Sequence, residues 1–120
     1  MNEKITFVTE SELPVTQCVE LKFKGYYLRV TEKDFNWIAE DVCLALRLSK
    51  NTWNKIPLEY RNLVQVLVGR GQQGLLFPNE VQTLNEDGLK HLIGFASKQT
   101  ALQFMEWYYE EAVPYLNWMA

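Results

Sequence analysis

The chain has 120 residues, enough for one domain of ordinary size. Hydrophobic residues make up 48% and charged residues 22%, which excludes a disordered tail, a collagen-like repeat and a coiled-coil rod. The formal net charge of −3 argues against a protein that coats nucleic acid without selectivity, because neutralising phosphates requires clustered cations.

The charges are distributed unevenly along the chain. Residues 21–70 carry nine cations and five anions, a net charge of +4, whereas residues 1–20 carry −3 and residues 71–120 carry −4. A basic central segment between acidic ends is compatible with a local nucleic-acid-binding surface. A chance distribution of charges on a solvated surface explains the same pattern.

The cysteines and the amino terminus predict a cytoplasmic protein. Cys18 and Cys43 lie 25 residues apart with no His or Cys beside either, which is neither a zinc spacing nor a disulfide framework. Residues 1–7 lack the pattern of a signal peptide, and no apolar run approaches the roughly 20 residues needed to span a bilayer. We therefore expect no metal, no cofactor and no membrane contact.

The first half of the chain predicts strands followed by a helix. Residues 1–17 read as a leader or an edge strand. Apolar residues then alternate over 19–23 and 26–30, on either side of a Lys24-Gly25 turn, and residues 35–38 fit a third strand of an antiparallel meander. From 39 to 48 the apolar period becomes helical, and a short helix is expected over 53–56.

The second half predicts a strand over 64–68, a loop over 69–74 and a hairpin formed by 75–77 and 81–84. Asn85 is placed to cap a helix, and Ser97 to cap a last helix over 98–112, which Pro114 kinks or ends. That last helix is apolar around most of its circumference, so it lies in a core or an oligomer interface. The predicted interface of a homodimer comprises Phe104, Trp107, Tyr108, Tyr109, Tyr115 and Trp118.

Residues for catalysis are scarce. The only histidine, His91, falls in an apolar helical pattern, which favours a structural role over that of a general base. Adjacent acid pairs such as Glu86-Asp87 point in different directions on a helix and are explained by the helix dipole. Residues 69–74 spell a G-x-G-x-x-G pattern, but strand signals flank it on both sides, so a hairpin loop is expected. We expect no enzyme.

The part of the sequence that indicates a function is a basic segment between residues 47 and 61, called the basic corner below. Its cations can neutralise phosphates, and its asparagines offer the paired donor and acceptor that read an adenine edge. A helix, a polar turn and a second short helix also form the outline of a DNA-docking corner. The alternative is a solvated loop whose Trp53 enters the core. The predicted DNA-binding residues are Arg47, Lys50, Asn51, Asn54, Lys55, Arg61 and, in the later loop, Arg70.

Three motifs, in order, resemble the Bro family amino-terminal domain, which occurs in phage antirepressors and large DNA viruses. Residues 36–46 resemble its tryptophan-led strand that enters a helix, and residues 84–93 resemble its Asn-Glu-x-Gly-Leu-Tyr-x-Leu segment. Residues 97–116 are similar to its closing helix and Val-Leu-Pro-x-Ile ending. Lys90-His91 stands where the family has Tyr-Arg, and Asn117 where a basic residue is common.

The resemblance implies an α+β domain of small antiparallel hairpins or a meander packed with three to four helices. It implies one such domain over residues 18–117, followed by a tail at 118–120, in a phage- or prophage-encoded protein of a bacterial host. Its function is then transcriptional regulation through double-stranded DNA. The alternative is an antirepressor that does not bind DNA and inactivates a repressor or another host protein by direct contact, which the net negative charge and the apolar last helix favour.

Overall fold

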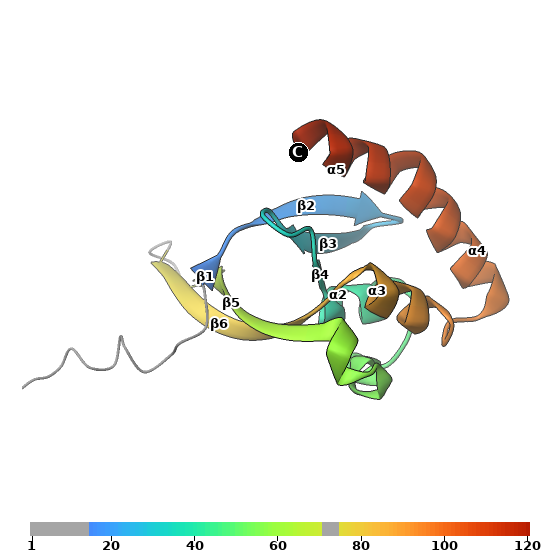
Figure 1. Ribbon diagram of the computed structural model, residues 1–120, viewed down its shortest axis with the longest axis horizontal. Helices are drawn as coiled ribbons and strands as arrows, with labels where there is room; N and C mark the ends of the chain where they lie inside the picture. Colours follow the sequence, from blue (N-terminus) through green and yellow to red (C-terminus); the bar gives the residue numbers. More distant parts are fainter. Residues whose placement is uncertain (1–14, 71–74) are drawn as a thin grey trace, which may run out of the picture.

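A computed structural model describes residues 15–70 and 75–120 and shows a curled six-stranded sheet packed with helices (Figure 1). The strand order is β1-β5-β6-β4-β3-β2, and all neighbouring strands are antiparallel except β1 and β5. The predicted α+β class is confirmed. The strands form one continuous sheet, so the separate hairpins of the prediction are parts of a larger unit.

The amino-terminal half of the sheet is the predicted meander. Strand β2 (Cys18–Phe23) and strand β3 (Tyr26–Thr31) form a hairpin around Lys24 and Gly25, which have φ angles of 49° and 86°. Two consecutive positive φ angles make a type I′ turn, whose twist matches that of the strands. Strand β4 (Trp37–Ile38) then pairs with β3 through Val30 and Trp37.

The carboxyl-terminal half of the sheet differs from the prediction. Strand β5 (Arg61–Arg70) pairs along its whole length with strand β6 (Leu75–Leu84), so the predicted hairpin over 75–77 and 81–84 is wrong. Pro78 can lie within β6 because β4 covers only Thr83 and Leu84, which leaves the outer edge of β6 without a partner strand at the proline. Residues 71–74 of the expected loop lie outside the described residues.

A short strand closes the other edge of the sheet. Strand β1 (Val15–Thr16) runs parallel to β5 and pairs with Gln65 and Val66. It is the part of the expected leader or edge strand that the structure describes, together with Gln17. Residues 1–14 lie outside the described residues.

Three short helical elements follow β4, and a capped helix follows β6. Helix α2 (Ala39–Ala45) is succeeded by two 3₁₀ turns, η2 (Thr52–Lys55) and η3 (Leu58–Tyr60). Helix α3 (Glu86–Ile93) begins at the predicted cap, where Asn85 Oδ1 accepts a hydrogen bond of 2.9 Å from the Gly88 N–H. The helix predicted to begin at the Asn85 cap is therefore present.

The carboxyl-terminal helical segment is longer than predicted. Ser97 caps helix α4 (Lys98–Trp107), and a π-helical turn η4 (Tyr108–Ala112) leads directly into α5 (Val113–Met119). Of the two effects predicted for Pro114, a kink or an end of the helix, the end is wrong, because the proline occupies the first turn of α5, where a missing N–H is tolerated. The helix runs through Met119, so residues 118–119 belong to it and do not form a separate tail.

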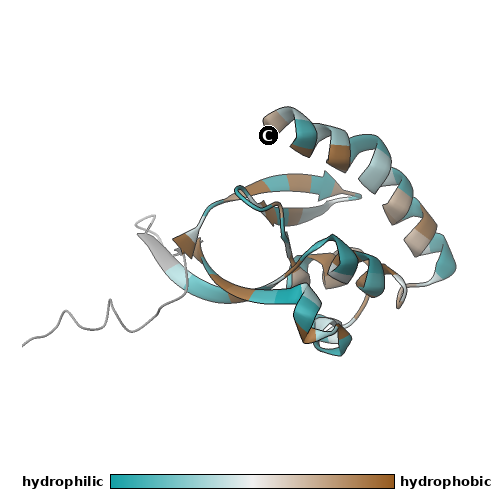
Figure 2. Ribbon diagram, in the orientation of Figure 1, coloured by the Kyte–Doolittle hydropathy of each residue, from teal (hydrophilic) through white to brown (hydrophobic). Residues whose placement is uncertain are grey.

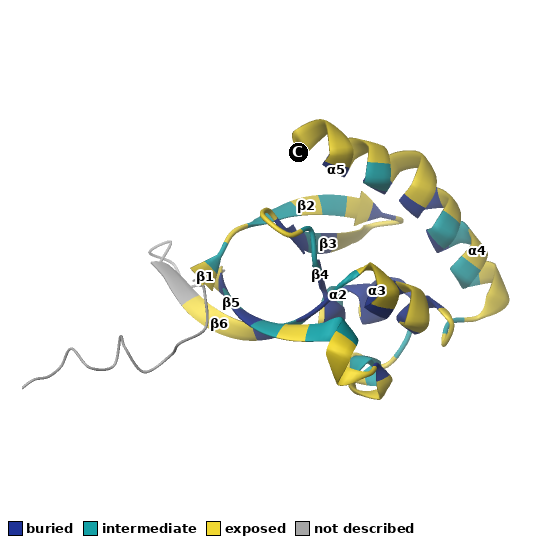
Figure 3. Ribbon diagram, viewed as in Figure 1, coloured by how far each residue is buried: buried dark blue, intermediate teal, exposed yellow. Residues whose placement is uncertain are grey.

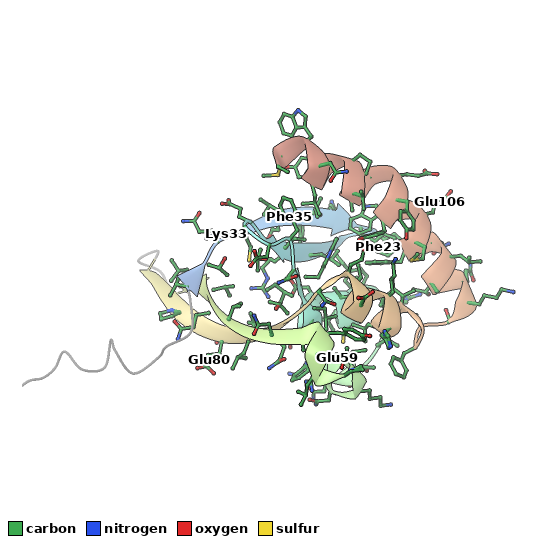
Figure 4. All side chains as sticks on the ribbon, in the orientation of Figure 1. Phe23, Lys33, Phe35, Glu59, Glu80 and Glu106 are labelled. Carbon is green, nitrogen blue, oxygen red and sulfur yellow. The ribbon has the colours of Figure 1, made fainter. Side chains whose placement is uncertain are left out.

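The main core lies between this long helix, α2, α3 and one face of the sheet (Figures 2 and 3). Phe23 lies beneath the long helix (Figure 4), with its ring centroid 5.1 Å from Phe104 and 5.3 Å from Trp107. A second, smaller cluster of Ile38, Val64, Val66 and Val81 contains Ile38, the neighbour of Trp37 in β4. Trp37 and Ile38 are both buried because successive strand residues point to opposite faces of a sheet.

Candidate nucleic-acid interface

The connection between α2 and β5 is held to the core by two apolar side chains. Ile56 is 2% exposed and Trp53 is half-buried, and both pack against the main core. The polar residues of the same connection face outward: Lys50, Asn51, Asn54 and Lys55 are all exposed. Trp53 therefore has the core role that the alternative reading gave it, and the basic residues around it still form an exposed surface.

Two of the predicted cations lie over aromatic rings. The Arg61 guanidinium carbon is 5.3 Å from the centroid of Trp53, and Lys55 Nζ is 5.5 Å from the centroid of Phe95. Arg61 Nε is buried and has no hydrogen-bond partner within the described part of the chain. Stacking of this kind limits the rotamers of both cations and keeps their positive charge at the surface.

The structure does not bring Arg70 to this corner. Arg61 begins β5 and Arg70 ends it, which separates their backbones by about 30 Å along a ten-residue strand. The side chain of Arg70 lies outside the part of the structure that is described. Arg70 therefore does not lie beside the basic corner, to which it was predicted to contribute a cation.

Arg29 also contributes little to the basic centre. Its guanidinium donates hydrogen bonds of 2.8 and 2.9 Å to the two carboxylate oxygens of Asp41, and its backbone N–H donates to the same carboxylate. The hydrogen bonds to Asp41 raise the pKa of the Arg29 guanidinium. This half-buried ion pair joins β3 to α2 and neutralises one cation of the middle segment.

The expected helix-turn-helix outline is only partly present. Helix α2 has seven residues and η2 is a 3₁₀ turn of four residues, which is too short to lie along a major groove as a recognition helix. Contact with a nucleic acid through this corner would therefore be made by a rigid turn.

Arg47 has a different environment from the other predicted DNA-binding residues. Helix α2 ends in a Schellman motif, in which the Arg47 N–H donates to the Leu44 carbonyl and the Leu48 N–H donates to the Cys43 carbonyl. This places Arg47 at a φ of 64°, a conformation in which glycine is preferred. The predicted helix over 39–48 is shorter for the same reason.

The side chain of Arg47 lines a cavity with residues that the sequence did not suggest. The cavity has a volume of about 250 Å³ and is bordered by Lys24 and Tyr26 from the β2–β3 hairpin and by Thr100 and Gln103 from α4. The signal that could have indicated this site is Lys24 itself, because a type I′ turn favours Asn or Gly at that position.

Half of the predicted oligomer interface is buried inside the chain. Phe104, Trp107 and Tyr108 are 0%, 8% and 5% exposed, so they belong to the chain's own core and cannot meet a partner. The Tyr108 hydroxyl donates a hydrogen bond of 2.8 Å to Glu86, and burial raises the pKa of the Tyr108 phenol. These three residues are removed from the predicted interface, because the long helix directs them toward the sheet.

The other three predicted interface residues are exposed. Tyr109 and Tyr115 are 51% and 42% exposed, and Trp118 is 80% exposed with its ring stacked on that of Tyr115. Glu110 and Glu111 are exposed on the same helical segment. The outer surface of the last helix is therefore aromatic and acidic.

Within residues 15–70 and 75–120, side chains with catalytic potential do not gather into a site. The Nδ1 of His91 is 3.0 Å from the backbone carbonyl of Asp87, one helical turn earlier, and the imidazole packs on Tyr60. Among the residues that the structure describes, no group of three His, Cys, Asp or Glu side chains could hold a metal ion. Cys18 and Cys43 are free thiols, and burial raises the pKa of both. None of the described helices has the length and apolar character to cross a membrane.

Comparisons of the chain with protein-family models, with curated proteins and with solved structures found no match. The resemblance to the Bro amino-terminal domain stays a prediction from the motifs. The motif residues that carry the resemblance have structural roles, since Trp37, Leu89, Phe104 and Trp107 are buried and Asn85 is a cap.

Proposed function

We propose that this protein is a DNA-binding regulatory domain that contacts double-stranded DNA through the turn at residues 50–55. The observation that carries this proposal is the combination of a fixed backbone and free polar side chains. Trp53 and Ile56 anchor the turn, while the side chains of Lys50, Asn51 and Asn54 have no hydrogen-bond partner among the described residues.

The chemistry of these side chains suits a nucleic acid. Lys50 and Lys55 can neutralise backbone phosphates, and Arg61 adds a positive charge beside Trp53. The asparagine amides can donate and accept hydrogen bonds at a base edge, adenine above all. Because Trp53 and Ile56 fix the backbone of the turn, little backbone conformational entropy is lost when the turn meets DNA.

Charge reversal at the turn tests the proposal. We expect Lys50→Glu with Lys55→Glu to weaken binding to a random-sequence duplex at least about tenfold, because two phosphate contacts become repulsive. The slope of log affinity against log salt should fall by about two. Fluorescence anisotropy of a labelled duplex, titrated at two salt concentrations, measures both quantities.

Lys33→Glu is the matched control, because Lys33 is an exposed cation in the turn between β3 and β4. It changes the net charge without altering the proposed surface, so affinity should stay near that of the unaltered chain. Equal duplex affinity for the double variant and the unaltered chain would remove this turn as the contact surface.

A second candidate function is protein binding through the last helix. The observation that favours it is that Tyr109, Tyr115 and Trp118 are exposed on the last helical segment, as are Glu110 and Glu111. Aromatic residues dominate binding hot spots, and an acidic rim complements the basic face of a DNA-binding repressor. Absence of duplex binding at low salt, together with co-elution with a purified repressor, would favour this function over the first.

The same helix surface also suits a second copy of the chain. If a homodimer forms there, Tyr115→Ser with Trp118→Ser should convert it to a monomer, because the largest exposed aromatic area is lost. Light scattering at high protein concentration measures the mass. A monomeric mass for the unaltered chain would contradict the homodimer.

A further inference from the structure

The cavity at the tip of the β2–β3 hairpin has the chemistry of an anion site. Its border contains two cations, Lys24 and Arg47, and no carboxylate. Neither cation forms an ion pair with a carboxylate among residues 15–70 and 75–120. A concave site of about 250 Å³ with two unpaired positive charges favours a small anion as its occupant.

The uncharged polar side chains that border the cavity have N–H and O–H groups available to donate hydrogen bonds. Gln103 Oε1 accepts a hydrogen bond from Lys24 Nζ, which leaves the Gln103 NH₂ group free to donate. Thr100 Oγ1 accepts from Ser97 Oγ at 3.0 Å, which leaves the Thr100 O–H free to donate. With the Tyr26 hydroxyl, these groups can direct several N–H and O–H donors at one ligand.

Both cations occupy backbone positions that other residues would stabilise better. Lys24 has a φ of 49° in a type I′ turn, where Asn is favoured, and Arg47 has a φ of 64° at the end of α2, where Gly is favoured. Two of the three non-glycine residues with positive φ in the described structure therefore border this one cavity. Residues kept in unfavourable backbone conformations cluster at functional sites. Asn and Gly, which these two backbone positions favour, carry no positive charge, whereas Lys24 and Arg47 do.

The surroundings of the cavity favour a small ligand over a nucleic acid strand. A second cavity of about 700 Å³ continues past Lys24 and Gln103 along the helix, and its border includes the carboxylates of Glu106, Glu110 and Glu111. A polyanion that extended from the first cavity into the second would meet three carboxylates against one additional cation, Lys22. A compact anion could occupy the first cavity alone.

We infer that this cavity binds a small phosphate-bearing molecule through Arg47 and Lys24. Arg47 supplies a planar guanidinium that can bind two phosphate oxygens, and Lys24, which borders the same cavity, supplies a second charge. Phe23 and Ala45 provide an apolar wall for the organic part of the ligand. This inference does not rest on the proposed DNA contact at residues 50–55.

Titration with inorganic phosphate at constant ionic strength tests the inference. The amide resonances of Lys24, Arg47, Thr100 and Gln103 should shift in ¹⁵N–¹H spectra and saturate with a dissociation constant of about 1 mM or below. Arg47→Gly and Lys24→Asn should each weaken phosphate binding about tenfold, because each removes a charge-assisted hydrogen bond. Both variants should fold with an unchanged or higher Tm, since each introduces the residue that its backbone favours.

Two control variants test whether phosphate binding is specific to this cavity. Lys33→Gln removes a cation outside the cavity border and should leave phosphate affinity unchanged. Lys50→Glu with Lys55→Glu should also leave it unchanged, which separates this site from the proposed DNA surface. Shifts that do not saturate by about 20 mM phosphate would overturn the inference. Full phosphate binding by Arg47→Gly, or displacement of phosphate by a short duplex, would overturn it as well.

Discussion

Phe104→Ala is expected to lower the free energy of unfolding by about 3–5 kcal/mol, the largest stability effect of any substitution considered. Phe104 is 0% exposed, and its ring centroid lies 5.1 Å from Phe23 and 5.2 Å from Trp107. Truncation removes the apolar area of the ring, an edge-on contact with Phe23 and a tilted contact with Trp107, and it leaves a cavity between the long helix and the sheet. Urea denaturation followed by tryptophan fluorescence measures the change.

Leu102→Ala on the same helix is the matched control. Leu102 is 62% exposed, so its truncation should change the free energy of unfolding by less than about 0.5 kcal/mol. If Phe104→Ala proved as mild as Leu102→Ala in the full chain, the long helix would not be docked on the sheet through this ring, and Phe104 would again be available to a partner.

The contrast between Phe104 and Tyr109 explains why the interface prediction was half wrong. Sequence periodicity shows that the last helix is apolar over most of its circumference, but it cannot show which part of that surface another element of the same chain covers. The sheet covers Phe104, Trp107 and Tyr108, and Tyr109 and Tyr115 face outward. That division depends on the direction in which the helix crosses the hairpin, which is a tertiary property.

Local signals predicted the elements that local chemistry determines. The Lys24-Gly25 turn, the Asn85 cap and the Ser97 cap each depend on residues adjacent in sequence, and all three are present. Pro78 misled the prediction because proline usually interrupts a strand. Whether a proline is tolerated depends on whether the strand has a partner on that side, and residues far from Pro78 determine that.

The candidate sites show the same limit. The turn at residues 50–55 could be found because its cations and asparagines are close in sequence. The cavity could not be found in this way, because Arg47 and Gln103 lie 23 and 79 residues after Lys24 in the sequence. The unusual lysine in the turn marks only one of its border residues. Arg47 was predicted as a member of the basic corner, and only the folded chain shows that it borders the same cavity as Lys24.

Gly88→Ala is expected to lower the free energy of unfolding by about 2 kcal/mol, in spite of the higher helix propensity of alanine. A Cβ atom at this position would lie 2.8 Å from the backbone carbonyl oxygen of Tyr60 and 3.2 Å from the Leu84 side chain. Tyr60 ends η3 and Leu84 ends β6, so neither can yield without moving a backbone segment. The close approach of α3 to Tyr60 and Leu84 therefore requires a glycine at position 88.

Gly94→Ala is the matched substitution, because it adds the same methyl group at the end of the same helix. Gly94 has a φ of −63° and a ψ of −17°, which alanine adopts readily, and its added Cβ would lie 3.2 Å from the His91 carbonyl oxygen. Its free energy of unfolding should change by less than about 1 kcal/mol. Urea denaturation of the two variants separates the contact from the general effect of replacing glycine, since both remove the same chain entropy from the unfolded state. Equal stability of the two variants would mean that α3 can move away from Tyr60 at little cost, and that Asn85 and its cap alone fix the helix in place.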